Sequence, residues 1–130
     1  MQEVCRELGI ELIAYSPLAL GLLSGRWSAD GPLPKGPRGA LFRRLLPELK
    51  PLQALMGELA ERHQISQAAL ALSWCRSHGA MPIPGLRRIE QVEAVRQALA
   101  CLLPDNDRRR LDEVAAMLKV SMPANPFSSS

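Results

Sequence analysis

The stretch Ile10–Arg26, IELIAYSPLALGLLSGR, decides how this sequence is interpreted. Its first part, Ile10–Tyr15, is mostly apolar and includes β-branched residues, which is typical of a parallel strand buried on both faces. A Ser-Pro turn and a loop follow, in which Gly21 and Gly25 let backbone N–H groups approach a ligand closely. Arg26 adds a fixed positive charge at the far end. Together these features suit a phosphate or pyrophosphate, and a purely structural loop is the alternative.

A second stretch, Met81–Gln91 (MPIPGLRRIEQ), repeats this logic. The apolar run Ala80–Ile83 predicts a short buried strand, and a helix is expected to start near Ile89 after a Pro-Gly turn. Arg87 lies where the strand end and the helix start converge, a place suited to an anion. Gln91, one turn further on, can reach a base edge or a ribose. A solvated turn with two surface arginines is the alternative.

Composition limits the classes of function that fit this chain. Its 130 residues, 47% hydrophobic and 22% charged, are sufficient for one soluble globular domain with a core. The net charge of +3 comes mostly from short arginine clusters rather than a continuous basic stripe. We therefore expect no nucleic-acid partner.

The cysteines and the hydropathy pattern indicate a reducing, cytoplasmic setting. Cys5, Cys75 and Cys101 are odd in number and form neither a CxxC nor a His/Cys ligand spacing, so no metal site and no disulfide framework are expected. No segment approaches the ~18 uninterrupted apolar residues of a membrane span, so no membrane partner is expected. Charged residues near the amino terminus argue against a signal peptide.

Helical periodicity and stop signals predict the remaining elements. They are a helix over 1–8 stopped at Gly9, an exposed Pro/Gly-rich loop over 28–39, a helix over 52–63, a helix capped by Ser66, a helix through Ile89–Leu99, and a last helix that packs Leu111, Val114, Ala115 and Leu118 inward. Strands that alternate with helices imply parallel pairing. Two strands alone make a poor sheet, so residues 1–120 are expected to be part of a larger barrel or sheet. Residues 121–130 are expected to form a disordered tail.

The two stretches together, YSPLALGLLSGR and IPGLRRIEQVE, closely resemble the aldo/keto reductase family. The resemblance covers nearly the whole chain, including the intervening QISQAALALSWC. It implies a helix-rich α/β fold, the C-terminal portion of a (β/α)₈ TIM barrel, with strands seven and eight and their helices. It also implies NADP(H) as the cofactor, bound across the carboxyl ends of the barrel strands.

The resemblance implies roles for ten cofactor-binding residues, in three groups. Tyr15 matches the aromatic residue that stacks on the nicotinamide ring. The second group, around the pyrophosphate, comprises Ser16, Pro17, Leu18 and Gly21, with Arg26 where the family often has Lys and Arg38 matching an arginine of the long loop over the cofactor. The third group, around the adenosine 2′-phosphate and adenine, comprises Gly85, Arg87 and Gln91. An arginine beside that phosphate would favour NADPH over NADH.

The chain departs from the family pattern at three places. The family commonly has Glu-Asn after the glutamine, where this chain has Ala94-Val95, so adenine is held more weakly or in another way. Arg88 stands at the expected N-cap, where the family often has Asn or Ser, so that helix start should be poorly capped. The catalytic Asp, Tyr, Lys and His come from the first part of the barrel. No catalytic residue is therefore expected here, and His63 and His78 are expected to be surface residues.

The resemblance implies NADPH-dependent reduction of small aldehydes or ketones to alcohols by a parent enzyme. This chain would supply the cofactor-binding end, would need the rest of the barrel, and would be inactive alone. The alternative is a non-catalytic, nucleotide-sensing regulatory subunit of the potassium-channel β type, which has a closely similar SPLA-x-G loop.

Overall fold

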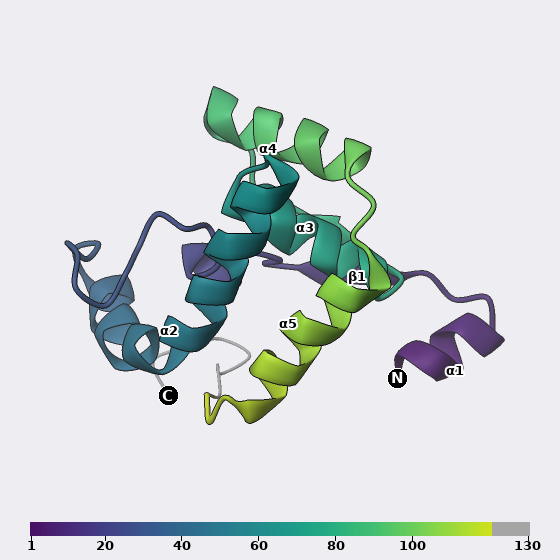
Figure 1. The fold of residues 1–130 in the computed structure, drawn as a ribbon, viewed down its shortest axis with the longest axis horizontal. Coiled ribbons are helices and arrows are strands. Elements are labelled where there is room, and N and C mark those ends of the chain that lie inside the picture. Colours follow the sequence, from purple (N-terminus) through teal and green to yellow (C-terminus); the bar gives the residue numbers. More distant parts are fainter. Residues whose placement is uncertain (121–130) are drawn as a thin grey trace.

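The computed structural model describes residues 1–120, and the expected disordered tail lies outside the described residues. The elements in this part follow the predicted order of helix, strand, long loop, helices, strand and helices (Figure 1). They are α1 (Gln2–Glu7), β1 (Leu12–Tyr15), the short 3₁₀ turn η1 (Ala19–Gly21), α2 (Pro37–His63), α3 (Gln67–Ser77), β2 (Ala80–Ile83), α4 (Ile89–Ala100) and α5 (Asp105–Met117).

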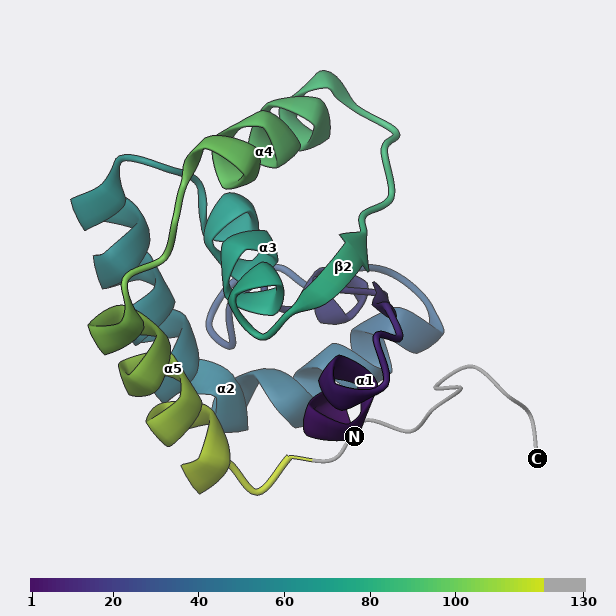
Figure 2. The ribbon, with the colours of Figure 1, turned by 90° about the vertical axis from the view of Figure 1, so that its right-hand side faces the viewer.

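The two strands form a parallel pair, as predicted. Leu12 pairs with Ala80, and the register continues to Tyr15 and Ile83. The crossover contains α3, which packs against β2 (Figure 2). The first strand begins at Leu12 rather than at Ile10, because the N–H of Ile10 donates to the carbonyl of Cys5 in the turn that ends α1. The end of each strand, from which the candidate loops leave, is placed as expected.

One face of this sheet is open, so the prediction of burial on both faces is wrong for the described residues. Ile13 and Met81 pair across the strands and are 53% and 50% exposed, and the neighbouring pair Tyr15 and Ile83 is 74% and 55% exposed. The cause is coverage, since α3 packs against β2, whereas within residues 1–120 the face with Ile13, Tyr15, Met81 and Ile83 remains exposed. An apolar face of this kind fits a sheet that continues into a larger barrel.

Helix α2 is longer than predicted, and the loop before it is shorter. We expected a helix from Leu52, whereas α2 begins at Pro37 and continues through Pro47 and Pro51. Prolines inside a helix remove hydrogen bonds and bend it, and α2 bends in its middle (Figure 2). Burial holds both halves in place, because apolar side chains recur at helical spacing on one face: Phe42, Leu45, Leu46, Leu49, Leu52, Met56 and Leu59.

A second, smaller core joins α3 to α4. It consists of Ala69 and Leu72 from α3 and Ala94 and Ala98 from α4. Small side chains let the two helices approach closely, while larger apolar residues of α4 such as Ile89 remain exposed. This packing fixes where α4 begins, and with it the loop that leaves β2.

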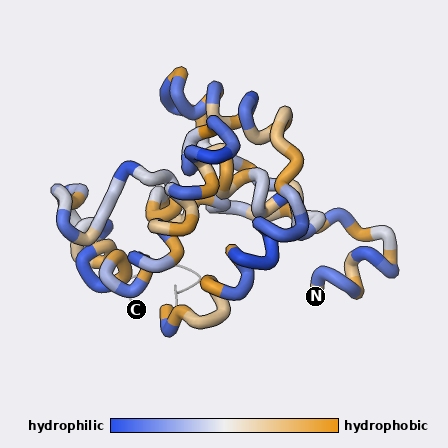
Figure 3. The backbone as a smooth tube through the Cα atoms, in the orientation of Figure 1, coloured by the Kyte–Doolittle hydropathy of each residue, from blue (hydrophilic) through white to orange (hydrophobic). Residues whose placement is uncertain are grey.

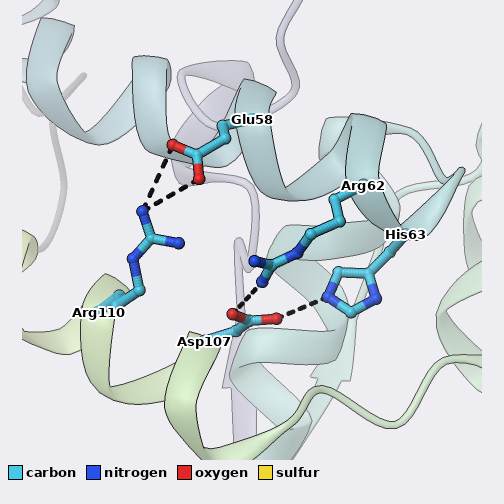
Figure 4. A network of polar contacts seen from close by, with 5 residues as sticks. All are labelled: Glu58, Arg62, His63, Asp107 and Arg110. Atoms are coloured by element: carbon cyan, nitrogen blue, oxygen red, sulfur yellow. Dashed lines mark hydrogen bonds and ion pairs between the residues drawn. The ribbon is translucent and has the colours of Figure 1, made fainter.

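Polar pairs hold α5, whose residues are largely hydrophilic (Figure 3). Leu111 is fully buried, and the carboxylate of Asp107 is buried beside Arg62 and His63 of α2. Asp107 pairs with Arg62, and its Oδ2 lies 2.7 Å from His63 Nε2 (Figure 4). Arg110 adds a 3.0 Å contact with Glu58.

The two histidines lie at the surface only in part, because each is half-buried and contributes to the packing of α5. The ring of His63 is mostly buried against Asp107, and His78 Nε2 lies 2.7 Å from Asp112 Oδ1, which also accepts a hydrogen bond from the Trp74 indole. Both histidines lie at helix ends, where they join α2 and α3 to α5.

Asp107 should make the fold sensitive to acid. Burial by itself raises the pKa of a carboxyl group, but hydrogen bonds from Arg62 and His63 outweigh burial and hold the pKa of Asp107 below its ordinary value. A lowered pKa means that the stabilisation is complete above about pH 4 and is lost as the pH falls through the pKa of the folded state. The free energy of unfolding should therefore drop on acidification below about pH 4.

Asp107→Asn should lower the free energy of unfolding at pH 7 by about 1–3 kcal/mol, because an N–H₂ donor replaces one of the two acceptor oxygens and one partner loses its acceptor. Part of the acid-induced loss should disappear in this variant. Urea unfolding at several pH values, followed by circular dichroism, measures both effects. Asp105→Asn is the control, since the Asp105 side chain is 87% exposed. Equal stability of the two variants would contradict the structural role of Asp107.

Gly39 should resist substitution although it lies in a helix. Alanine normally stabilises a helix interior by about 1 kcal/mol relative to glycine. At Gly39, however, an added Cβ would lie 2.0 Å from the carbonyl oxygen of Pro34, which is backbone and cannot move away cheaply. We expect Gly39→Ala to lower the free energy of unfolding by about 1–3 kcal/mol.

Gly57→Ala on the same helix is the matched control for Gly39→Ala. Its Cβ would lie 3.1 Å from Gln67 Nε2, the end of a flexible side chain that can shift. Urea midpoints of the two variants measure the difference. A Gly39→Ala protein as stable as the Gly57→Ala protein would show that the loop before α2 yields easily.

Candidate functional site

Two loops leave the same end of the sheet. β1 ends at Tyr15 and continues into the loop that contains η1, while β2 ends at Ile83 and continues into the turn before α4. Because the strands are parallel, their carboxyl ends lie side by side. In α/β folds, this edge is where ligands bind. A pocket of about 600 Å³ lies here, between the two loops and the beginnings of α2, α3 and α4.

Most of the predicted cofactor-binding residues line this pocket. Eight of the ten do so, namely Ser16, Pro17, Leu18, Gly21, Arg26, Arg38, Gly85 and Gln91. The two stretches singled out in the sequence, far apart along the chain, thus meet at one hollow.

Tyr15 and Arg87 lie outside the pocket lining. Tyr15 is the last residue of β1, directly before the pocket residue Ser16, and its side chain belongs to the open face of the sheet. Of the two adjacent arginines in the turn before α4, Arg88 lines the pocket and Arg87 does not. In the sequence, Arg88 is predicted to be an unsuitable helix cap and not a cofactor-binding residue.

The loop after β1 is strained and internally bonded. Ser16, Ala19 and Leu20 adopt left-handed φ values of 51°, 49° and 60°, which cost side-chain-bearing residues free energy. The N–H of Gly21 donates to Leu18 O, and that of Ser24 donates to Gly21 O. Several of the N–H groups expected to meet a ligand therefore stabilise the loop itself. The positive charge of the pocket comes instead from side chains.

Three arginines give the pocket its charge. Arg26 comes from the loop after β1, Arg88 from the turn after β2, and Arg38 from the first turn of α2 rather than from the predicted loop. Glu90 is a carboxylate of the lining. Among residues 1–120, none of these three guanidinium groups forms an ion pair. A pocket with three such cations is suited to an anion with several negative charges.

Gln91 orders the turn that carries Arg88. Its Oε1 accepts hydrogen bonds from the backbone N–H groups of Arg87, at 2.5 Å, and of Arg88, at 2.9 Å. Gln91 thus supplies one half of a capping box, while the Arg88 side chain makes no cap hydrogen bond, as expected. The carboxamide oxygen of Gln91, expected at a base or ribose, is thus engaged with the backbone.

Sequence reasoning missed several pocket residues, among them Ser24, Trp27, Ser66, Arg88 and Glu90. Trp27 had a recognisable signal, since an aromatic residue directly follows the loop cation. Within residues 1–120, no group of three or more His, Cys, Asp or Glu side chains is arranged to hold a metal ion. None of the helices in this part of the chain has the length and apolar character needed to cross a membrane.

Comparison with known proteins supports the resemblance seen in the sequence. The chain is 39% identical to the chloroplastic pyridoxal reductase of Arabidopsis thaliana over 129 residues, which cover 99% of this chain and 35% of that protein. It is 33% identical to the probable aldo-keto reductase 1 of Glycine max over 116 residues, covering 85% of this chain and 33% of the relative. The chain therefore spans about a third of the length of the curated relatives it matches.

A solved structure shares the fold. The glycerol dehydrogenase of Gluconobacter oxydans superposes with a TM-score of 0.77 at 24% identity, covering 100% of this chain and 41% of the dehydrogenase. The α/β arrangement of residues 1–120 thus corresponds to part of a larger known fold. The family model described as the aldo/keto reductase family matches residues 1–116, and this chain belongs to that family.

Proposed function

We propose that this chain is the cofactor-binding end of an NADPH-dependent reductase that converts small aldehydes or ketones to alcohols. The observation that carries the proposal is the pocket at the carboxyl ends of β1 and β2, where eight of the ten predicted cofactor-binding residues meet. Membership of an oxidoreductase family adds to it. The alternative of a regulatory subunit has no observation of its own in the described residues.

The donor set of the pocket fits the phosphate groups of NADP(H). Arg26, Arg38 and Arg88 bring three positive charges, and guanidinium groups can bind phosphate with two parallel hydrogen bonds. Ser16 and Ser66 also line the pocket. When bound, the cofactor would supply the hydride that reduces the carbonyl carbon.

Each part of the chain would position one part of the cofactor. Tyr15, at the carboxyl end of β1, would place its flat ring beside the nicotinamide. Arg26 and Arg38 would bind the pyrophosphate, and an arginine of the Arg87-Arg88 pair would bind the 2′-phosphate. The groups that move protons lie outside this chain, so it would be inactive alone. The open face of the sheet supports this requirement for the rest of a barrel.

The names of relatives support the cofactor and the substrate class. One relative, from Schizosaccharomyces pombe, is named an aldo-keto reductase with NADP(+) and is 28% identical over 123 residues. The pyridoxal reductase acts, by its name, on pyridoxal, which is an aldehyde. A cytoplasmic location remains our proposal for this chain, whereas the name of that relative places it in the chloroplast.

We propose Arg88 rather than Arg87 for the 2′-phosphate contact, because Arg88 lines the pocket and Arg87 does not. Arg88→Ala should weaken NADPH binding by about 1.5–3 kcal/mol, the scale of a hydrogen bond to a charged group. NADH binding should change little, since NADH has no 2′-phosphate. Fluorescence titration of the protein with each cofactor measures both dissociation constants.

Arg87→Ala is the matched control, because it removes an equal charge from the neighbouring residue outside the pocket lining. It should leave both dissociation constants nearly unchanged. If Arg87→Ala alone weakens NADPH binding and leaves NADH binding unchanged, then Arg87, the residue matched from the sequence, makes the 2′-phosphate contact. Equal losses for NADPH and NADH would show that neither arginine reads the 2′-phosphate. Absence of NADPH binding by the unmodified chain when the rest of the barrel is present would overturn the proposed function.

A further inference from the structure

Two of the three pocket arginines share one aromatic ring. The guanidinium carbon of Arg26 lies 5.1 Å from the centre of the Trp27 ring, and that of Arg38 lies 5.9 Å from it. Arg38 is also 5.7 Å from the ring of Phe42. Arg26 belongs to the loop after β1 and Arg38 to α2. Trp27 is thus a shared partner of two cations from different elements.

The position of Trp27 is itself fixed. Gln53, on α2, donates hydrogen bonds from its Nε2 to the carbonyl oxygens of Leu22 and Trp27, at 3.0 and 2.9 Å. Those two carbonyls bracket the segment that carries Arg26. The Trp27 ring also packs edge-on against Phe42, with 6.1 Å between ring centres and 72° between ring planes. The loop, α2 and the indole therefore form one connected unit.

The way in which these cations are held matters for binding. A carboxylate partner would fix an arginine but would also neutralise its charge. Within residues 1–120, neither Arg26 nor Arg38 has such a partner. The face of an indole attracts a guanidinium group through its quadrupole and leaves the net charge unchanged. Both cations are thereby held at one aromatic ring with their charge available to a ligand.

We infer that Trp27 is the positioning residue of this pocket, which holds Arg26 and Arg38 together so that they bind a diphosphate group. This inference rests on the proposed function for the identity of the ligand. It goes beyond the matched contacts because Trp27 acts through the two arginines, and Gln53 acts through Trp27.

The test measures binding of NADPH and of inorganic pyrophosphate by calorimetry. Trp27→Leu should weaken both by roughly 5- to 30-fold, since it removes two contacts between a cation and an aromatic ring. Trp27→Phe keeps a ring and should lose less than Trp27→Leu. Trp74→Leu is the matched control, because it removes the second tryptophan of the chain, which lies outside the pocket lining. It should leave both affinities within about twofold.

A spectroscopic measurement separates positioning from general support of the fold. In a Trp74→Phe protein, Trp27 is the remaining tryptophan, so the emission reports its surroundings alone. Pyrophosphate should change this emission, and the change should vanish when Arg26 and Arg38 are both replaced by Met. Gln53→Met, which removes both loop hydrogen bonds, should weaken pyrophosphate binding while the indole remains present.

The outcomes distinguish this inference from the function on which it rests. Pyrophosphate binding that weakens in Trp27→Leu, without NADPH binding by the unmodified protein, would overturn the proposed function and retain the role of Trp27. NADPH binding that is equally tight in Trp27→Leu and in Trp74→Leu would overturn the role of Trp27 and retain the proposed function. If the unmodified protein binds neither NADPH nor pyrophosphate, the role of Trp27 and the proposed function are both overturned. If Trp27→Leu does not fold, two other measurements decide. The inference is overturned if Trp27→Phe binds as tightly as the unmodified protein and if pyrophosphate leaves the Trp27 emission unchanged.

Discussion

The parallel pairing of β1 with β2 is the constraint on which the candidate site depends. Parallel strands require a crossover, and the segment between them supplies it through α2 and α3. The same pairing places the two strand ends at one edge. The loop with Arg26 and the turn with Arg88 can therefore face one pocket although sixty-one positions separate the two residues. A change of strand direction would send the two loops to opposite ends.

This pairing is incomplete as a sheet, and the rest of the molecule shows the consequence. The main core lies between helices, where Phe42, Leu46 and Met56 of α2 are fully buried, rather than over the strands. The apolar side chains on the open face of β1 and β2 gain little from burial in this chain. This contrast between a buried helical core and an exposed strand face fits a unit whose helices pack on one another and whose strands lack neighbouring strands. Further strands that close the sheet into a barrel would bury that face.

The sequence predicted elements well where a local signal was sufficient. Ser66 caps α3 by accepting a hydrogen bond from the N–H of Ala69, and Gly79 adopts a left-handed φ of 76° beyond the end of α3, both as expected. The start of α2 was not predictable in this way, because Pro47 and Pro51 are local stop signals that burial of the surrounding apolar face overrides. Long-range packing of this kind cannot be recognised in a short segment of the sequence.

The sequence predicted which two segments form the pocket, but it predicted less well which of their side chains line it. The two stretches were placed correctly, but which of two adjacent arginines lines the pocket depends on how the turn before α4 is held. That turn is set by the hydrogen bonds from the N–H groups of Arg87 and Arg88 to Gln91. In the same way, the pairing of His63 with Asp107 depends on how α5 packs against α2, which no spacing along the chain reveals.

The arginines of this chain are held in two ways, and the difference follows from what each must do. Arg62 and Arg110 are paired with carboxylates, so their charge is neutralised where α5 meets α2. Arg26 and Arg38 lie against the ring of Trp27, which orients them without neutralising them. An ion pair serves a contact that is already complete, because adding a further anion to it gains little. A cation on an aromatic ring is oriented but remains uncompensated, which is the condition for binding an anion that arrives from solution.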